Sequence, residues 1–455
     1  MGNEGNSNIS MNNEFKKIIN ERGHNLLYKL LPHKDYLQRN EKSFKTDTPS
    51  ISIDSSQIKF IDSFKTKDLS GNTVERFFLV KNQYIGLNIN DYKELHQLIN
   101  LIYKNKELKN IVCKEYLEDV IFNWFELLYK GLASSELSEF LTNEMPKSIK
   151  EYFIGIPIAY TEIESPFTFG KVTFREFNKD IIDKSYNETI RIQGEQSTES
   201  LSLFFEEVRR KYQGKAIAII QVVAEKKRAE EIAYKEVEQA ISLLRFFHKA
   251  SQNPLSVSYS TLSGMKEPIS KSIFFFKNDF FTNHNTELVG TLDIWSISKD
   301  NINLYKQVGF DIISNLIKGK RNNFQNKLID ALMLFSKCSI TDNFSDKLTA
   351  ITVAAESIFI KDNNEPIQQN LADRIAFLVS DEPTERLKIV KIIKDTYKLR
   401  SKFLHHGKDV DEIDLFTSFL KIIWSSFFYM INLSQNIEID THEKFLSYIE
   451  HKKYS

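Results

Sequence analysis

The C-terminal third of the chain has the pattern that most limits its fold. From about residue 321 onward, apolar residues recur at helical spacing in one segment after another, and the connections between segments are short. Each segment therefore has an apolar stripe that needs another element to cover it. Short connections place neighbouring helices antiparallel, so we expect residues 321–455 to form an all-α bundle of about four to six helices. The expected helices are Asn326–Ser339, Asp346–Ile360, Gln368–Ser380, Glu385–His405 and Asp411–Ser434.

The chain before this bundle mixes strand-like and helix-like patterns. Residues 1–48 are rich in Asn, Glu, Lys and Ser, and we expect them to form a polar tail. Residues 49–315 combine short alternating stretches with long amphipathic segments, which predicts a mixed α/β region with a division into two subdomains near residues 140–150. The chain is therefore predicted to be α+β, with this mixed region followed by the helical bundle.

Several elements of the mixed region can be predicted individually. Strands are expected at Phe153–Tyr160 and at Phe167–Phe177, the second folded back at Gly170. A long helix is expected at Ala224–Ala250, and a further strand at Leu255–Tyr259.

Composition excludes several classes of protein. Sixty-one basic residues balance 61 acidic ones, so no global field draws the chain toward nucleic acid or an anionic membrane. Two cysteines, Cys113 and Cys338, are too few for a disulfide framework or a cysteine-rich zinc module. The first thirty residues lack the apolar segment of a signal peptide, so we expect a cytoplasmic protein. The apolar segment Leu415–Leu433 contains Lys421, which would cost about 2.5–3.5 kcal/mol at a bilayer centre, so no membrane span is expected.

The helix expected at Glu385–His405 has the most informative charge pattern. At about 100° per residue, its lysines share one sector and its apolar residues fill the opposite side. Arg400 falls on the apolar side, where a guanidinium needs an ion pair or a shared cavity. Between Arg386 and Lys408 there are eight basic residues and one acidic residue, a local patch suited to phosphate contacts. The candidate RNA-binding residues are Lys391, Lys394, Lys398 and Lys402.

No phosphate-binding glycine loop, His-Glu-x-x-His or Gly-x-Ser-x-Gly motif occurs in the chain.

The segment Tyr397–Gly407 (YKLRSKFLHHG) resembles the Tyr-x-x-Arg-Ser-x-x-x-His-Gly signature of Apea-like HEPN domains, and Ala354–Ile358 and Leu371–Ile375 resemble upstream helices of that family. The resemblance covers residues 320–435. It implies a helical bundle that pairs, so that Arg and His of two chains line one cleft. It also implies metal-independent ribonuclease activity in phage defence or as a toxin, without a cofactor.

The resemblance assigns roles to individual residues. Arg400 would hold the phosphate, and a histidine would take the 2′-OH proton or protonate the leaving 5′-oxygen. Counting from Arg400 favours His405, whereas adjacency to Gly407 favours His406. The expected products are a 2′,3′-cyclic phosphate and a 5′-OH. The expected partners are RNA, tRNA included, a second copy of the chain, and a phage-derived trigger or an antitoxin.

Four residues are candidates for supporting roles. Tyr397 could orient Arg400 or bind phosphate, and Glu356 and Arg374 are expected to form an ion pair with each other or with Arg400. Ser401 stands where many nucleases of the wider superfamily have Asn, Asp or His, which favours an alternative function: a non-catalytic module for RNA binding, nucleotide binding or dimerisation. A third hypothesis is an interaction protein that assembles through Leu415–Leu433.

Overall fold

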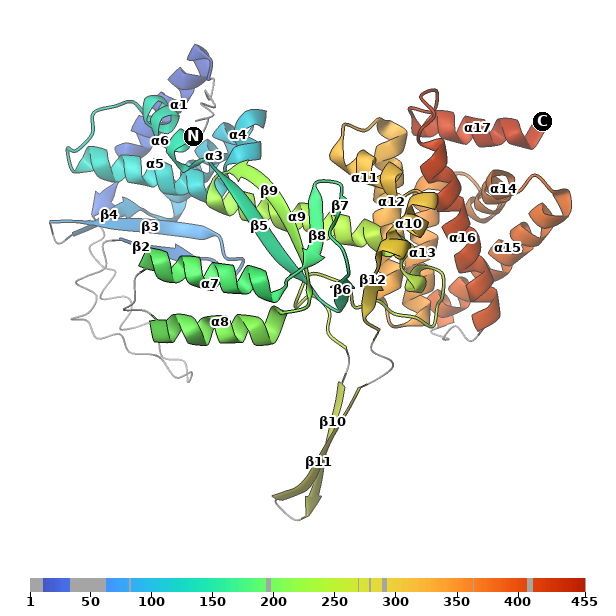
Figure 1. The fold of residues 1–455 in the computed structure, drawn as a ribbon. Helices are drawn as coiled ribbons and strands as arrows, with labels where there is room; N and C mark the ends of the chain where they lie inside the picture. Colours follow the sequence, from blue (N-terminus) through green and yellow to red (C-terminus); the bar gives the residue numbers. More distant parts are fainter. Residues whose placement is uncertain are drawn as a thin grey trace. The chain divides into compact units, whose positions relative to one another are not determined.

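The chain has an α+β fold and divides into two compact units (Figure 1). The computed structural model describes residues 11–32, 63–81, 83–193, 198–268, 270–277, 280–288, 293–362, 364–406 and 412–454. One unit comprises Met1–Tyr152 and Val222–Ile232, and the other comprises Phe153–Gln221 and Ala233–Ser455. The division after Tyr152 lies close to the subdomain division expected near residues 140–150. No division falls between residues 315 and 321, where the sequence suggested a domain boundary.

The first unit packs helices against an antiparallel sheet. The described strands follow the order β1-β4-β3-β2. Ser70, Gly71 and Asn72 turn the chain between the last two of these strands, and the Asp68 carboxylate accepts hydrogen bonds from the Ser70 and Asn72 amides. The elements are α1 (Asn13–Leu27), β1 (Leu31–Pro32), β2 (Ser63–Lys67), β3 (Thr73–Val80), β4 (Gln83–Leu87), α3 (Ile89–Ile102), α4 (Lys106–Ile111), α5 (Lys114–Tyr129) and α6 (Leu137–Ser148).

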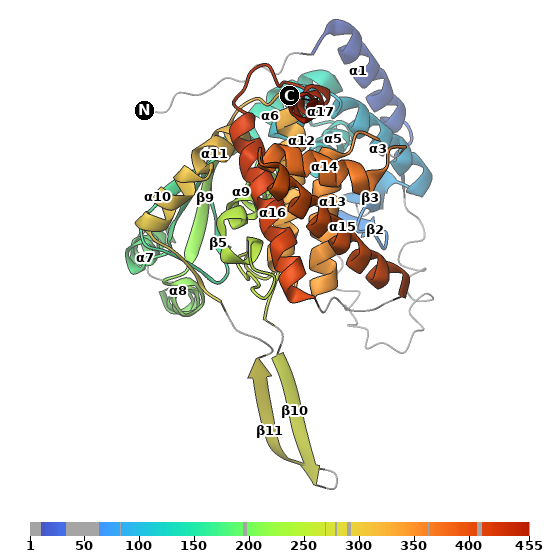
Figure 2. The same ribbon diagram turned by 90° about the vertical axis from the view of Figure 1, so that its right-hand side faces the viewer.

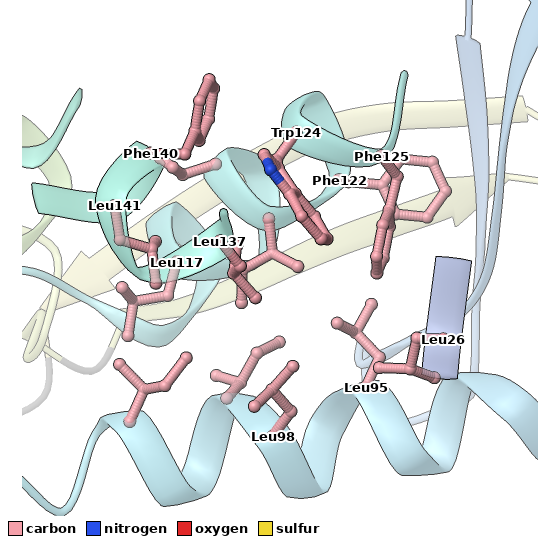
Figure 3. Packing of buried hydrophobic residues seen from close by; sticks show 14 of the residues in the cluster. Leu26, Leu95, Leu98, Leu117, Phe122, Trp124, Phe125, Leu137, Phe140 and Leu141 are labelled. Carbon is pink, nitrogen blue, oxygen red and sulfur yellow. The ribbon is translucent and has the colours of Figure 1, made fainter. Parts of the chain in front are cut away.

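The core of this unit lies where α3, α5 and α6 meet (Figure 3). Helix α5 buries Leu117, Ile121, Trp124 and Phe125, which share one face because they are spaced three or four residues apart. Figure 3 shows Leu95 and Leu98 of α3 pointing toward these side chains. The spacing of these apolar residues therefore accounts for the packed face of α5.

The expected polar tail is wrong for residues 13–27, which form helix α1. Its Ile19 and Leu26 are buried in the same core, and Gly23 leaves room for Leu137, whose Cδ2 would lie 2.7 Å from a Cβ at residue 23. The side chain of Asn12 caps the helix by accepting a hydrogen bond from the Phe15 amide. The apolar stripe is narrow and lies among Asn, Lys and Glu, so composition conceals it. Residues 1–10 and 33–48 of the expected tail lie outside the described residues.

The second unit begins with another sheet, whose described strands follow the order β5-β9-β8-β7. Strands β7 and β8 form the expected hairpin at Gly170, which has φ +64° and whose amide donates to Ser314 Oγ at 2.9 Å. Figure 1 shows the hairpin β10–β11 extending away from the other elements of its unit. The elements are β5 (Lys150–Ile158), β6 (Thr161–Ile163), β7 (Phe167–Phe169), β8 (Val172–Glu176), α7 (Lys179–Gln193), α8 (Thr198–Tyr212), β9 (Ala216–Ala224), α9 (Lys226–Leu244), η3 (Arg245–Phe247), η4 (Lys249–Ser251), β10 (Ser270–Lys277), β11 (Phe280–Leu288), β12 (Trp295–Ile297), α10 (Lys299–Gln307) and α11 (Phe310–Lys318).

The strand expected at Leu255–Tyr259 is wrong. Lys347 Nζ donates hydrogen bonds to the carbonyl oxygens of Pro254 at 2.7 Å and Ser256 at 2.6 Å, and the Ser258 amide donates to Ser339 O. The segment therefore satisfies its backbone groups against the helical bundle instead of a neighbouring strand. Burial lowers the pKa of the Lys347 ammonium to about 8.

The helices after residue 321 form the expected bundle (Figure 2). Figure 2 shows α13, α14, α15 and α16 side by side. Helix α17, which the sequence reading missed, packs against α14 and α12. The helices are α12 (Asn323–Ile340), α13 (Phe344–Phe359), α14 (Ile367–Val379), α15 (Pro383–His406), α16 (Ile413–Leu433) and α17 (His442–Tyr454).

The bundle shares its core with the residues before it. The Trp424 ring of α16 stacks on Phe246 of η3 with a centroid distance of 5.1 Å, and its indole Nε1 donates to Phe246 O at 3.0 Å. Phe246 also contacts Phe335 of α12. This packing explains why no boundary falls between 315 and 321. Helix α16 is the expected bundle helix, with Lys421 exposed, and across the described ranges no helix is long and apolar enough to cross a lipid bilayer.

Candidate active site

Helix α15 places the candidate residues, and its sequence explains its position. Pro383 occupies its first turn, where a missing amide proton costs nothing. The buried side chains Ile389, Ile393 and Leu399 recur along one face, and that face packs against α14 and α16. Arg400 is seven residues after Ile393, about two turns along the helix, so it shares this face and its side chain reaches Glu356 of α13 instead of the outer surface.

Arg400 forms the ion pair that its position requires. Its Nη1 donates to Glu356 Oε1 at 2.9 Å, and the Tyr397 hydroxyl donates to the same oxygen at 2.7 Å. Tyr397 and Arg400 lie one turn apart on α15, and the guanidinium carbon is 5.8 Å from the centroid of the Tyr397 ring. Glu356 comes from the last turn of α13. The three side chains that the sequence reading placed near one another are therefore in contact.

The electrostatics of this cluster favour a charged Arg400. Glu356 lies at the carboxyl end of α13, where the helix dipole is negative, so both the carboxylate and the helix end favour a neighbouring cation. Burial raises the pKa of the Tyr397 hydroxyl, and its hydrogen bond to Glu356 raises it further, so Tyr397 acts as a neutral donor. The side chain of Arg400 is 21% exposed and that of Glu356 is 23% exposed, so solvent reaches the pair. Arg400 Nε is buried and has no hydrogen-bond partner among the residues that the structure describes.

Arg374 does not belong to this cluster: of the two ion pairs expected for Glu356, the structure has the one with Arg400 and not the one with Arg374. Its Nη1 and Nη2 donate to the two carboxylate oxygens of Glu365 at 2.8 and 2.9 Å, and Nη1 also donates to Phe359 O at 2.6 Å. Burial alone would raise the pKa of Glu365, but hydrogen bonds from Arg374 and the Lys361 amide outweigh it, and the pKa is lowered. Arg374 therefore holds the connection between α13 and α14, which is a structural role.

The two histidine positions lie in the last turn of α15. The helix continues through His406, so it does not end between Arg400 and the two histidines. At about 100° per residue, His405 lies about 140° and His406 about 120° around the axis from Arg400. Neither residue therefore shares the face of Arg400. The side chains of His405 and His406 lie outside the described residues.

The candidate RNA-binding lysines differ in their surroundings. Lys391 and Lys402 are exposed and, across the described part of the chain, have no carboxylate within salt-bridge distance. Lys398 is also exposed but lies 2.8 Å from Asp395 Oδ1, and this hydrogen bond lowers the pKa of Asp395. Lys394 is half-buried, and its carbonyl oxygen accepts a hydrogen bond from Gln368. Ser401 is exposed beside them.

Two residues that support the site region were missed by sequence reasoning. Glu365 is the partner of Arg374, and His442 of α17 contacts Ile358 O through Nε2 at 2.7 Å, next to the turn that carries Glu356. The charge pairing of Glu365 with Arg374, nine residues apart, crosses a loop and has no helical spacing that would reveal it. His442 has no signal in the sequence because its partner is a main-chain oxygen.

The chain has no match among known family models, curated proteins or solved structures. In the ranges that the structure describes, no three His, Cys, Asp or Glu side chains gather as ligands of a metal ion.

Proposed function

We propose that this protein is a metal-independent endoribonuclease of the HEPN type, acting in the cytoplasm in bacterial anti-phage defence or as a toxin. The observation that supports this function best is the state of Arg400. It is held by Glu356 and Tyr397 at a half-buried edge of α15, stays open to solvent, and lies on the same helix as exposed lysines and two histidines.

The reaction needs only groups that this chain and its RNA supply. RNA carries its own nucleophile, the 2′-OH. His405 or His406 accepts that proton or protonates the leaving 5′-oxygen, which an imidazole can do near neutral pH. Arg400 binds the phosphate and stabilises the charge that develops on it. Glu356 and Tyr397 would act as positioning residues, because Glu356 accepts a hydrogen bond from Arg400 and Tyr397 donates to the same carboxylate oxygen.

We infer that two chains complete one site. Arg400 and the histidine positions face different directions on an unbroken helix, so one chain does not present both to one phosphate. A two-fold pair of bundles would place Arg400 of one copy opposite the histidine of the other. Lys391 and Lys402 on the exposed face of α15 would then contact neighbouring phosphates of RNA, tRNA included. The residues before the bundle would respond to a phage-derived trigger or bind an antitoxin.

The non-catalytic alternative has an observation of its own. Arg400 Nη1 is already engaged by Glu356, and Ser401 follows it on the helix. An arginine used only to pair α15 with α13 would also have these contacts. In that case the bundle would bind RNA or a nucleotide, or dimerise, without cleaving RNA.

The first experiment is RNA cleavage by purified protein in excess EDTA, with total RNA and a tRNA pool as substrates and the fragment ends mapped. Wild type should leave 2′,3′-cyclic phosphate ends, and Arg400→Lys and His405→Ala should each lose activity at least 100-fold. Arg210→Lys, an exposed change on α8, and His451→Ala on α17 are the matched controls and should cleave normally. Activity retained by His405→Ala but lost by His406→Ala would assign His406. RNA bound but left intact by wild type, with phage lysate added, would support the alternative.

Mixing two inactive variants tests whether the site is shared. If Arg400→Lys and His405→Ala chains pair, each mixed dimer has one intact site and one site with both changes. Half of the dimers would be mixed, so about a quarter of wild-type activity should return. A site formed within one chain would show no recovery at any mixing ratio.

A further inference from the structure

A second candidate site lies in the second unit, away from α15. A cavity of about 670 Å³ opens between η3, η4, β12, α10 and the middle of α16. Its volume is in the range of about 300–1,000 Å³ that is typical of small-molecule sites. Phe247, Trp295 and Ile294 supply an apolar wall, and the Phe247 ring stacks on Tyr305 with a centroid distance of 5.1 Å.

A buried histidine lines this cavity. His248 is only 2% exposed, and its ring lies edge-on against Trp295. Its Nδ1 accepts a hydrogen bond from the Ala250 amide at 3.0 Å, so the neutral imidazole carries its proton on Nε2. That Nε2 lies 3.6 Å from Asp293 Oδ2, beyond hydrogen-bond distance, so its proton has no close acceptor among the described residues.

Two more side chains that line the cavity have hydrogen-bond donors without a described acceptor. The Tyr305 hydroxyl accepts a hydrogen bond from Trp295 Nε1 at 3.3 Å, and its own proton has no acceptor in the described ranges. Asn301 uses its carbonyl oxygen to cap α10 at Ser298, which leaves its amide hydrogens without a described acceptor. Both residues lie on the same side of α10, one turn apart, so they can form hydrogen bonds to the same ligand.

The charges at the cavity are mainly positive. Lys249 Nζ lies 3.0 Å from Asp293 Oδ2, so these two charges offset each other. Lys421 of α16 also lines the cavity, and it has no carboxylate within salt-bridge distance in the part of the chain that the structure describes. Together with the unused donors, this ammonium favours a ligand that carries acceptor oxygens and negative charge.

We propose that this cavity binds a nucleoside phosphate. Lys421, Tyr305 and Asn301 would bind the phosphate oxygens, the apolar wall at Trp295 and Ile294 would contact the base, and Asp293 would accept hydrogen bonds from hydroxyl or amino groups. The site is independent of the proposed nuclease reaction, because no residue of α15 lines it. Its ligand would contact both the region before the bundle and Lys421 of the bundle helix α16.

Isothermal titration calorimetry on the full-length protein tests the site with AMP, ATP, GMP, adenosine, ribose 5-phosphate and inorganic phosphate. At least one nucleotide should bind saturably, and adenosine, ribose 5-phosphate and inorganic phosphate should each bind at least tenfold more weakly. Lys421→Glu should weaken nucleotide binding at least tenfold and Tyr305→Phe about threefold to tenfold. Lys306→Glu, an exposed change on α10 outside the cavity, is the matched control, and thermal melting checks that each variant folds.

Three outcomes would overturn the proposal. The first is the absence of saturable binding by any nucleotide at millimolar concentration, and the second is unchanged affinity in Lys421→Glu. The third is an affinity for adenosine or inorganic phosphate equal to that for the tightest-binding nucleotide, because the site would then not recognise the base and the phosphate of one ligand. Arg400→Lys should bind nucleotide as wild type does, so failure of the nuclease proposal leaves this test intact.

Discussion

Glu356 is the residue on which the position of Arg400 depends. Glu356→Gln keeps an acceptor for Tyr397 but leaves the half-buried guanidinium without a counter-charge. We expect a loss of about 1–3 kcal/mol in the free energy of unfolding, measured by urea denaturation at neutral pH. Glu385→Gln removes a carboxylate that is 52% exposed and pairs with Lys388, so it should change stability by less than about 0.5 kcal/mol. Equal small losses in both variants would mean that the ion pair does not hold Arg400.

His248 should make stability depend on pH. Burial lowers the pKa of its imidazole to about 4; Asp293 opposes this shift, and Lys249, Arg245 and Lys347 reinforce it. The unfolded chain has an imidazole pKa of about 6.5, so between pH 6.5 and 4 it binds a proton that the folded chain excludes. Stability should therefore fall by about 3 kcal/mol as the pH decreases through this window.

Urea denaturation at several pH values checks this dependence. His248→Asn keeps an oxygen that can accept from the Ala250 amide but has no proton to gain, so its stability should change less between pH 6.5 and 4. Some dependence should remain, because burial also lowers the pKa of His442. His451→Asn, an exposed change, should follow wild type. If the slope of unfolding free energy against pH is the same in His248→Asn as in wild type, another group is responsible for the pH dependence.

The exposed face of α15 should contribute to RNA affinity unevenly. Lys391 and Lys402 have no described carboxylate partner, whereas Lys398 is paired with Asp395. Removing one lysine that binds a phosphate should lower the slope of log affinity against log salt by about one. We expect that result for Lys391→Gln and Lys402→Gln, and a smaller change for Lys398→Gln. The measurement is fluorescence anisotropy of labelled RNA from low to high salt. Lys306→Gln on α10 serves as the control, and equal slopes in all variants would exclude α15 as the RNA-binding face.

The second unit should fold as a whole and not as a separable bundle. A fragment of residues 321–455 would lack Phe246 in the core at Trp424 and would leave the buried Lys347 without Pro254 O and Ser256 O. Lys347 is only 1% exposed, so an unpaired ammonium there costs several kcal/mol. We expect no cooperative thermal transition for 321–455 and a cooperative one for 153–455, followed by near-ultraviolet circular dichroism. A cooperative transition in the shorter fragment would contradict the shared core.

Sequence patterns predicted the features that depend on residues close together in the chain, such as helix faces and turns. The apolar stripe of α15 predicted its buried face, because residues three or four apart share a helix face. Gly170 predicted the β7–β8 turn, because glycine tolerates positive φ. The position of Arg400 on an apolar face predicted that it needed a partner. Glu356 was one of the candidates, since both residues lie on helical faces that turn inward.

Long-range pairing was decided only by the tertiary structure. Arg374 forms its ion pair with Glu365 and not with Glu356. The segment Leu255–Tyr259 packs against the bundle and is not a strand, and helix Asn13–Leu27 contributes to the core of the first unit. In each case the partner lies across a loop or far along the chain, at a separation that no helical or strand period links. By itself the sequence determined the α+β class, the helical bundle and the need for an ion pair at Arg400. Only the tertiary structure determines which groups pair. A charge or a main-chain group is buried only when the elements pack, and an unpaired group then costs free energy.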